Sequence, residues 1–537
     1  MKPKEASFLD LMNNGLVRKE IFKMLSFFHD ISNLSRTCQE LNWITDSEIF
    51  LRTMSFYHDF QSVNIRIKEE TPEDLSVVKM DNIIFEKDER FFLEKNFFNK
   101  YFGETILKSN CTTIFYSNWI EEFAEDERKL FIDKLSNEMD LNCRLRSNTK
   151  ILDFMIDFSY HTSMILNVLS SMKHQNISHI KVSDIIFMEH NTNVYKELKS
   201  NIFDGFPNFH KLEIECIFFV YYYKRFIKNG NILEKIFSEL SKRKNATLIL
   251  NFSHCEYDRL INFVYMILEI TRSYKIKLKC NIMYVLESID GRNNINWTIH
   301  RSIYLPIKLY LTSLTITIAN SKYFRDIMKS LQNFTNLETL QLEFLFFDIK
   351  KNIKVEERIH GDCMSLKNLT KLTNLKLYFA EFINRNNNLN VKKFCSNLMY
   401  LFTLMPKYVH KLELIVVPIL TNEVAKIINE FLPNLEILVT YRVLFYEADC
   451  LLPLKNLHTL ICHERLPNLI PNTIELLAIK QKISEENNAI AEENQKLIDA
   501  YSKNFTKILF DIDGRYVFFN NIRKWNFYKH VIEESFW

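Results

Sequence analysis

One short apolar pattern recurs along the chain from about residue 110 onward: apolar, two residues, apolar, one residue, apolar. The second and third apolar positions are two residues apart, which is the period of a strand with one buried face. The pattern therefore predicts a series of short strands. Their middle apolar residues are Phe154, Ile180, Leu212, Leu248, Leu278, Leu314, Leu340, Leu375, Leu412, Leu438, Leu460 and Leu477. Around Leu435 and Leu438 the register is ambiguous.

The spacing of these strands leaves room for a helix between many of them. Steps are irregular, the shortest from Leu460 to Leu477 and the longest from Leu375 to Leu412. Segments 161–173, 232–242 and 324–331 fit the helical returns. The pattern resembles the strand half of a leucine-rich repeat, of the irregular kind found beside F-box modules. We therefore expect an α/β solenoid over 111–483, with a parallel inner sheet and outer helices.

The start of the chain has a different period, typical of short amphipathic helices. A first stripe consists of Val17, Ile21, Met24, Leu25 and Phe28. Asp30 can cap a second helix, whose apolar face repeats at Ile31, Leu34, Cys38 and Leu41. A third helix can start at 45–48, where Thr and Glu have capping-box spacing. Three such helices predict a small module over 1–58 that needs a partner or a following domain to bury its apolar faces.

This module resembles the F-box. The resemblance rests on Leu16-Val17, on Met24-Leu25-Ser26-Phe27-Phe28, and on the segment from Leu34 through Cys38 and Leu41 to Trp43. Val17 stands where the family usually has Pro, and Lys19 where it usually has Glu. The resemblance implies docking on the Skp-type adaptor of a cullin-based ubiquitin ligase. The implied contacts are Leu16, Ile21, Met24, Leu25, Phe28, Ile31, Leu34, Cys38 and Leu41.

In such a protein the repeats would hold a protein substrate, and the chain would be a receptor and not an enzyme. Outward strand positions give the candidate substrate contacts, on register alone: Gln341, Glu343, Lys376, Tyr378, Glu413, Ile415, Ile461 and His463. Two alternatives stay open. The repeats can form a scaffold without any ubiquitin ligase, with the N-terminal helices as a cap. The apolar triplets can also recur by chance in an α/β protein rich in Ile, Leu and Phe.

The remaining segments have simpler interpretations. Residues 59–110, with a charged stretch at 68–74, are predicted to connect the helical module to the repeats. Residues 484–537 are predicted to cap the last strand, with a polar helix over 484–503 and a hairpin over 507–519 that turns at Asp513-Gly514. A terminal cap protects the last edge of a repeat array from pairing with other chains.

Composition excludes several classes of chemistry. The chain has 7 glycines, and the closest pair is Gly205 and Gly230. Dinucleotide fingerprints, Walker loops and nucleophile elbows need clustered glycines, so none can be built. The 10 cysteines form no C-x-x-C pair, which excludes common zinc modules. The formal net charge of +3 provides no global field for nucleic acid or membrane. We expect no cofactor or metal, and a cytoplasmic or nuclear location because no signal or membrane segment is visible.

Four local clusters contain residue types found in catalytic or binding sites. Asp511 and Asp513 lie in a string that resembles the D-x-D-G of haloacid-dehalogenase phosphatases, which leaves a hydrolase as a third hypothesis. His254, Cys255, Glu256 and Asp258 are nucleophile, base and acid types in one predicted loop, but triads form by spatial convergence. His458, Cys462 and His463 offer few metal ligands. Cations and aromatics in 523–529 favour a protein contact over a nucleic-acid one.

Overall fold

The structure is a computed structural model of the whole chain. It describes residues 8–24, 62–68, 84–87, 111–116, 150–156, 169–184, 201–216, 231–252, 257–285, 306–318, 324–345, 347–349, 364–380, 390–480, 488–502, 515–519 and 531–532, together with positions 34, 37–39, 41, 44 and 166. The chain divides into two compact units. The middle unit comprises Gln61–Glu343 and Asp362–Leu372, and the terminal unit comprises Met1–Phe60, Phe344–Gly361 and Thr373–Trp537.

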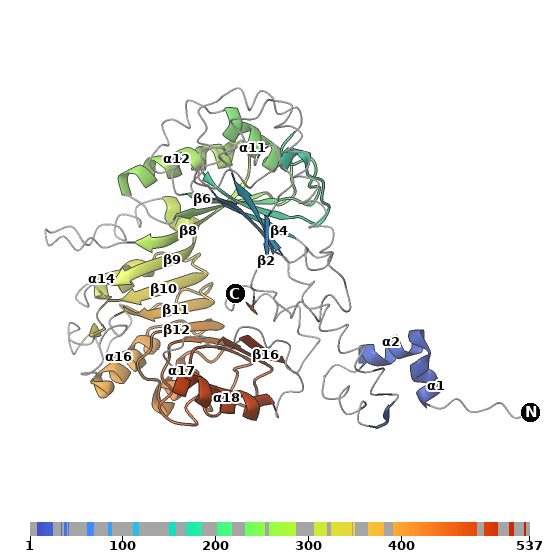
Figure 1. Cartoon of the computed structure of the whole chain (residues 1–537). Coiled ribbons are helices and arrows are strands. Elements are labelled where there is room, and N and C mark those ends of the chain that lie inside the picture. Colours follow the sequence, from blue (N-terminus) through green and yellow to red (C-terminus); the bar gives the residue numbers. More distant parts are fainter. Residues whose placement is uncertain are drawn as a thin grey trace, which may run out of the picture. The chain divides into compact units, whose positions relative to one another are not determined.

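The middle unit is built around one sheet (Figure 1). Its strands are β1 (Ser62–Lys68), β2 (Ile84–Lys87), β3 (Cys111–Tyr116), β4 (Ile151–Ile156), β5 (His179–Ser183), β6 (Lys211–Cys216), β7 (Thr247–Phe252), β8 (Lys277–Val285), β9 (Leu311–Ile318) and β10 (Thr339–Phe344). Their order is β2-β3-β1-β4, followed by β5 to β10 in chain order. Helices α11 (Asn231–Ser241) and α12 (Tyr257–Ser273) lie together on one face of the sheet. The other helical segments are η4 (Pro306–Leu309) and α14 (Phe324–Leu331).

The terminal unit repeats the same plan. Strands β11 (Asn374–Phe379), β12 (Lys411–Ile415), β13 (Ile437–Tyr441), β14 (Thr459–His463) and β15 (Leu476–Lys480) are parallel neighbours in chain order. β16 (Arg515–Phe519) pairs antiparallel with β15. Helices α16 (Val391–Thr403), α17 (Asn422–Phe431) and α18 (Asn488–Ser502) belong to this unit. So do α1 (Phe8–Asn13) and α2 (Gly15–Met24).

The predicted strands are confirmed, since each of the middle apolar residues lies within one of β4 to β15. Register aligns them in two series. Ile180, Leu212, Leu248 and Leu278 face one another in the middle unit. Leu375, Leu412, Leu438, Leu460 and Leu477 do so in the terminal unit, which resolves the register at Leu438. A parallel sheet with one strand per repeat and helical returns is the arrangement of a leucine-rich-repeat-type fold.

The structure corrects the predicted alignment of two of the middle apolar residues, Phe154 and Leu314. Leu152, and not Phe154, pairs with Ile180. Between β8 and β9 the register shifts, so that Leu314 lies opposite Ile282 and not Leu278. Both corrections concern strands whose neighbouring positions are also apolar, and an apolar pattern cannot then fix which residue faces which.

The predicted returns 232–242 and 324–331 match α11 and α14 closely. Helices α12, α16 and α17 were not predicted. Residues 59–110 are more than a connector, because β1 lies there and pairs with β3 and β4. Alternating apolar residues at Val63, Ile65 and Ile67 were the available signal. In the predicted cap, β16 closes the edge of β15, while 507–514 lie outside the described residues.

Corners before the strands are held by asparagine side chains. The amide Nδ2 of Asn336 donates to the carbonyl oxygen of Leu309 at 2.7 Å, and that of Asn456 to Pro433 at 2.7 Å. Asn208 and Asn434 bond Gln175 and Lys407 in the same way. Each bond joins one corner to the corner of the preceding repeat. The asparagine side chains thus satisfy backbone carbonyl groups at the corners, where the strand pairing has ended.

Left-handed backbone positions in these repeats are occupied by residues other than glycine. Val416, Arg442 and Glu464 have φ of 55°, 53° and 75°, and each directly follows one of β12, β13 and β14. Such a conformation costs a non-glycine residue roughly 1–2 kcal/mol. Backbone hydrogen bonds to the next repeat, such as Val416 N–H to Tyr441 O at 2.7 Å, hold it in place.

Gly205 is the glycine that the fold requires most clearly. A Cβ at this position would lie 1.8 Å from the carbonyl oxygen of Met172, and the Gly205 carbonyl accepts from His174 N–H at 2.9 Å. We predict that Gly205→Ala lowers the free energy of unfolding by about 1–3 kcal/mol, because backbone must shift to relieve the clash. Urea denaturation followed by circular dichroism measures the change.

Gly15→Ala is the matched control, since a Cβ there meets nothing within 4 Å. It should leave stability unchanged or raise it slightly. An equal loss in both variants would show that the contact with Met172 is not the cause.

Candidate binding surface

In the terminal unit, one row of outward residues crosses the carboxyl ends of five strands. Register aligns Tyr378, Ile415, Tyr441, His463 and Lys480, one from each of β11 to β15. We call these five residues the edge row. Tyr441 is 37% exposed, and the other members are partly exposed. The Tyr441 and His463 rings are in tilted contact, with centroids 5.6 Å apart. The edge row thus offers an aromatic and aliphatic strip that ends in a cation.

Arg442 lies at one side of this row. Its Nε donates to both carboxylate oxygens of Glu464, at 3.1 and 3.0 Å, and its guanidinium carbon is 5.5 Å from the Tyr441 ring centroid. The hydrogen bond and charge of Glu464 raise the pKa of Arg442 further. Since both residues occupy left-handed corners, the ion pair ties two consecutive corners together beside the aromatic strip.

Tyr378, Ile415 and His463, three of the predicted substrate contacts, belong to the edge row. Tyr441 and Lys480 complete it but were not predicted. They lie at the same offset from Leu438 and Leu477 as Ile415 does from Leu412, so the sequence contained the signal. The ambiguity around Leu438 concealed the first of them.

The neighbouring row toward the strand starts is mostly buried, and we call it the inner row. Lys376, Glu413, Val439, Ile461 and Ala478 are aligned, and of these only Lys376 is more than 9% exposed. Ile461 is fully buried, which contradicts its assignment as a substrate contact. Glu413 is also buried and is held by Lys376 Nζ at 2.8 Å and Lys411 Nζ at 3.1 Å. A buried carboxylate needs such partners, so this cluster is structural.

Gln341 and Glu343, the two predicted contacts on β10, form hydrogen bonds within the sheet. Glu343 is 9% exposed, and its carboxylate accepts from Thr317 Oγ1 at 2.9 Å and from Gln341 Nε2 at 2.7 Å. Burial and these two bonds place Glu343 within the sheet's own polar network. We therefore exclude it from the candidate binding surface.

A chain of polar side chains crosses the middle unit, and no local sequence pattern indicated it. His179 Nε2 lies 2.8 Å from Glu213 Oε2, and Asn251 Nδ2 donates to Glu213 Oε1 at 2.7 Å. Asn281 Nδ2 then donates to Asn251 Oδ1 at 2.8 Å, and Thr312 Oγ1 to Asn281 Oδ1 at 2.9 Å. We call these five residues the polar ladder. It joins β5 to β9 through outward side chains of successive strands, as cross-strand neighbours allow.

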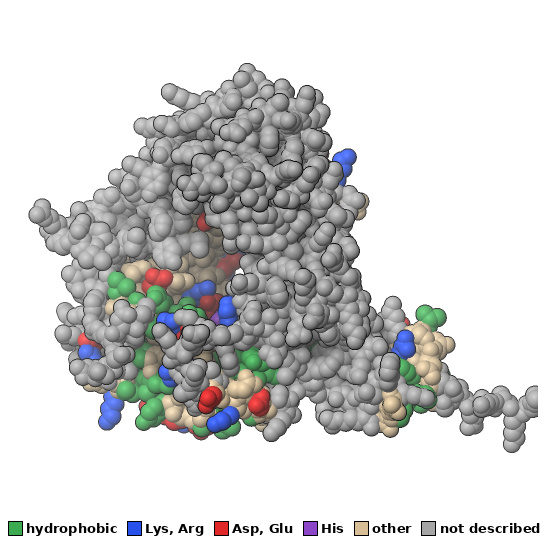
Figure 2. Space-filling view, in the orientation of Figure 1, with side chains coloured by type: hydrophobic (Ala, Val, Ile, Leu, Met, Phe, Trp, Pro, Cys, Tyr) green, Lys and Arg blue, Asp and Glu red, His purple; other side chains and the backbone are tan. Residues whose placement is uncertain are grey.

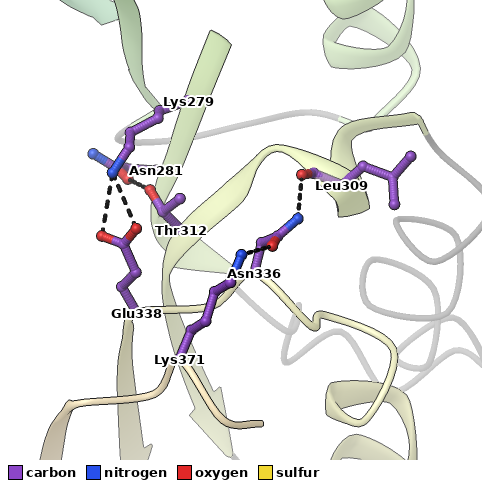
Figure 3. A network of polar contacts seen from close by, with 7 residues as sticks. All are labelled: Lys279, Asn281, Leu309, Thr312, Asn336, Glu338 and Lys371. Atoms are coloured by element: carbon purple, nitrogen blue, oxygen red, sulfur yellow. Dashed lines mark hydrogen bonds and ion pairs between the residues drawn. The ribbon is translucent and has the colours of Figure 1, made fainter. Parts of the chain in front are cut away.

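A second network lies beside the end of this ladder (Figure 3). Lys279 Nζ contacts both carboxylate oxygens of Glu338, at 3.0 and 3.3 Å. Lys371 Nζ donates to Asn336 Oδ1 at 2.5 Å, while Asn336 Nδ2 bonds the Leu309 carbonyl. The outward side chains of the ladder and of this network are therefore polar, and most of them bond one another.

The pKa values of Glu213 and His179 are both lower than usual. Burial alone would raise the pKa of Glu213, but hydrogen bonds from His179 and Asn251 and the charge of Lys181 lower it to about 2. Burial lowers the pKa of His179 and outweighs its contact with Glu213. At neutral pH the ladder therefore places a neutral imidazole beside a carboxylate, with His179 Nε2 2.8 Å from Glu213 Oε2.

The N-terminal candidates divide into three groups. Leu16, at the start of α2, is 80% exposed, and Ile21 and Leu34 are partly exposed. Cys38 is exposed, whereas Leu41 is buried. Met24 ends α2, and Leu25, Phe28 and Ile31 lie outside the described residues. Asn14 Oδ1 caps α2 by accepting from Leu16 N–H at 3.1 Å.

The other candidate clusters lie mostly outside the described residues. Asp511, Asp513, His254, Cys255, Glu256 and residues 523–529 lie outside the described residues, and Asp258 falls in the first turn of α12. Cys462 is fully buried, and burial raises the pKa of its thiol to about 12. His458 Nδ1 instead lies 3.3 Å from the Thr473 carbonyl oxygen. No group of three metal-binding side chains occurs in the described ranges.

Over the terminal unit, hydrophobic side chains are visible among charged ones in the part that carries α17 and α18 (Figure 2). Exposed Leu444, Tyr446 and Leu469 belong to this unit, at 39%, 68% and 49%. Single exposed apolar side chains are ordinary on protein surfaces, so these three residues assign no site by themselves.

A family model described as a domain of unknown function, DUF8346, matches residues 108–532. The chain belongs to this family. Its matched segment includes β3 and every later strand, so the family's fold comprises the repeats of both units. No curated protein matches the chain. Among solved structures, an internalin from Listeria monocytogenes matches at 14% identity and a TM-score of 0.21, covering 59% of this chain and 82% of that one. Within the described ranges, no helix has the length and apolar character to cross a membrane.

The lowered pKa of Glu213 predicts how the stability of the protein depends on pH. Its folded pKa lies below the ordinary value of 4.5, so its contribution to stability is present above that value and is lost as pH falls toward about 2. Between about pH 5 and about pH 3, wild type should lose about 2 kcal/mol more unfolding free energy than Glu213→Gln. Urea denaturation at each pH measures the difference.

The matched control is Glu215→Gln, which removes an exposed carboxylate from the same strand. It should retain the wild-type pH profile. If both variants flatten the profile equally, the ladder is not the source of the acid sensitivity.

Proposed function

We propose that this protein binds another protein through the edge row of its terminal unit. The observation that carries the proposal is the contrast between adjacent rows: the inner row is closed by burial and ion pairs, whereas Tyr378, Tyr441 and His463 remain partly exposed. Aromatic residues enrich protein interfaces because they offer large contact area together with a polar group. A shallow repeat surface of this type suits a macromolecule and not a small substrate.

We further propose that the bound protein is a substrate of a cullin-based ubiquitin ligase. The resemblance of residues 16–43 to the F-box supports this, as does the exposure of Leu16 on α2. In this scheme α2 and the residues after it dock on a Skp-type adaptor in the cytoplasm or nucleus. The chain then acts as a receptor without catalytic residues, and raises the local concentration of the substrate near the ligase.

Adaptor docking is tested with Leu16→Asp in the full chain against a purified Skp-type adaptor. A charge placed in an apolar contact removes its burial energy, about 1.5–3 kcal/mol for one leucine, and adds desolvation cost. Binding should weaken at least about tenfold by titration calorimetry. Because Leu16 is exposed, the variant should fold normally.

Leu469→Asp is the control, since it places the same charge at an exposed leucine of the repeats. It should bind the adaptor as wild type does. Absence of binding by wild type, or equal loss in both variants, would exclude the ligase proposal and leave the protein-binding proposal standing.

The edge row is tested by proximity labelling in cells with Tyr441→Ser. Proteins that depend on the edge row should lose most of their labelling, about tenfold, because a buried interface tyrosine contributes more than about 1 kcal/mol. Tyr265→Ser, at a 49% exposed position of α12, is the control and should keep the wild-type set. An unchanged set in Tyr441→Ser would contradict the proposal.

A further inference from the structure

The corners that precede β7 and β8 carry an excess of positive charge. Residues 242–246 and 272–277 contain six cations and no acidic residue. Five of them have exposed side chains, Lys242, Lys244, Arg272, Lys275 and Lys277, and we call these five the basic corners. The small formal net charge of +3 does not reveal this local excess.

The two corners are adjacent in space. Lys277 N–H donates to the Ala246 carbonyl at 2.9 Å, and Thr247 pairs with Lys277 across β7 and β8. The two corners are therefore separated by about one strand spacing, roughly 4.8 Å. Within the described residues, none of the five side chains forms an ion pair. The sixth cation, Arg243, instead donates to the Phe203 carbonyl at 2.7 Å.

Helix ends account for only part of this charge. Cations near the carboxyl ends of α11 and α12 are favoured by the helix dipole, but the effect fades beyond the last turn. Lys244 and Lys275 lie past the helices, and Lys277 is in β8. Like charges on neighbouring corners repel, so their accumulation destabilises the free protein and is relieved by an anionic partner.

We propose that the basic corners bind an acidic segment of the partner protein, and this inference rests on the proposed protein-binding function. Charge complementarity defines the class of partner: carboxylate side chains on an extended chain. The next corner, before β9, adds Lys308 and Leu309, whose side chain is 56% exposed and points away from the strands (Figure 3). An apolar residue among the acidic ones therefore fits this site.

A protein segment fits better than a nucleic acid. Single-stranded nucleic acids need exposed aromatic platforms for base stacking, and Tyr274 and Tyr310, the aromatic residues of these three corners, are only partly exposed. The cluster is also short, about 10 Å from the corner of β7 to that of β9, which an extended peptide of about four residues spans. A net charge of +3 adds no wider basic field.

The test uses the full chain and a fluorescein-labelled peptide of about eight residues that alternates Glu and Leu, with anisotropy as the readout. The triple variant Lys242→Gln, Lys244→Gln, Lys277→Gln should bind about tenfold more weakly at low salt, and wild-type affinity should fall as salt rises. The control triple Lys392→Gln, Lys426→Gln, Lys496→Gln removes the same charge from exposed lysines of the terminal unit and should bind normally.

A second measurement needs no variant. Carbodiimide coupling of the peptide's carboxylates to lysine amines should place adducts on the four lysines of the basic corners and not on Lys392 or Lys426. Equal loss in both triples, or adducts spread over all lysines, would overturn the proposal. Tighter binding of a single-stranded RNA of equal charge would assign the site to nucleic acid instead. Failure here leaves the Tyr441 experiment unaffected, so the two proposals fail separately.

Discussion

Hydrogen bonds between successive corners hold the repeats of this protein in register. In the terminal unit, the N–H groups of His410 and Lys411 both donate to the Thr373 carbonyl, and those of Glu436 and Ile437 donate to His410. The same pair of bonds recurs at each later parallel strand. Register is thus passed from one repeat to the next, and a slip of one residue would exchange the buried and outward faces of every following strand.

The scarcity of glycine acquires a structural meaning from these corners. Most repeats turn through asparagine bonds or through left-handed Val416, Arg442 and Glu464, which neighbouring strands hold in place. Gly205 remains where two backbones approach too closely for any Cβ. The composition thus excludes phosphate-binding loops while permitting a repeat fold whose turns are stabilised by their neighbours.

The two units use the same outward strand positions for different purposes. In the middle unit they form the polar ladder, in which neutral His179 and ionised Glu213 begin a chain of side-chain bonds. In the terminal unit the equivalent rows separate into a closed inner row and the open edge row. Self-satisfied polar groups stabilise a sheet, whereas partly exposed aromatic groups gain energy from a partner. For this reason the edge row, and not the polar ladder, is the candidate binding surface.

The sequence by itself determined where strands β4 to β15 lie, because apolar alternation is a local property of each segment. It also located Tyr378, Ile415 and His463 in the edge row from their offset to a central leucine. Only the tertiary structure decided that β1 joins the sheet, that β8 and β9 shift register, and that Ile461 is buried while Tyr441 is open. Pairing partners and burial depend on residues far apart in the chain, so no local pattern encodes them. The same holds for the basic corners, where hydrogen bonds between neighbouring repeats bring together charges from two separate helix ends.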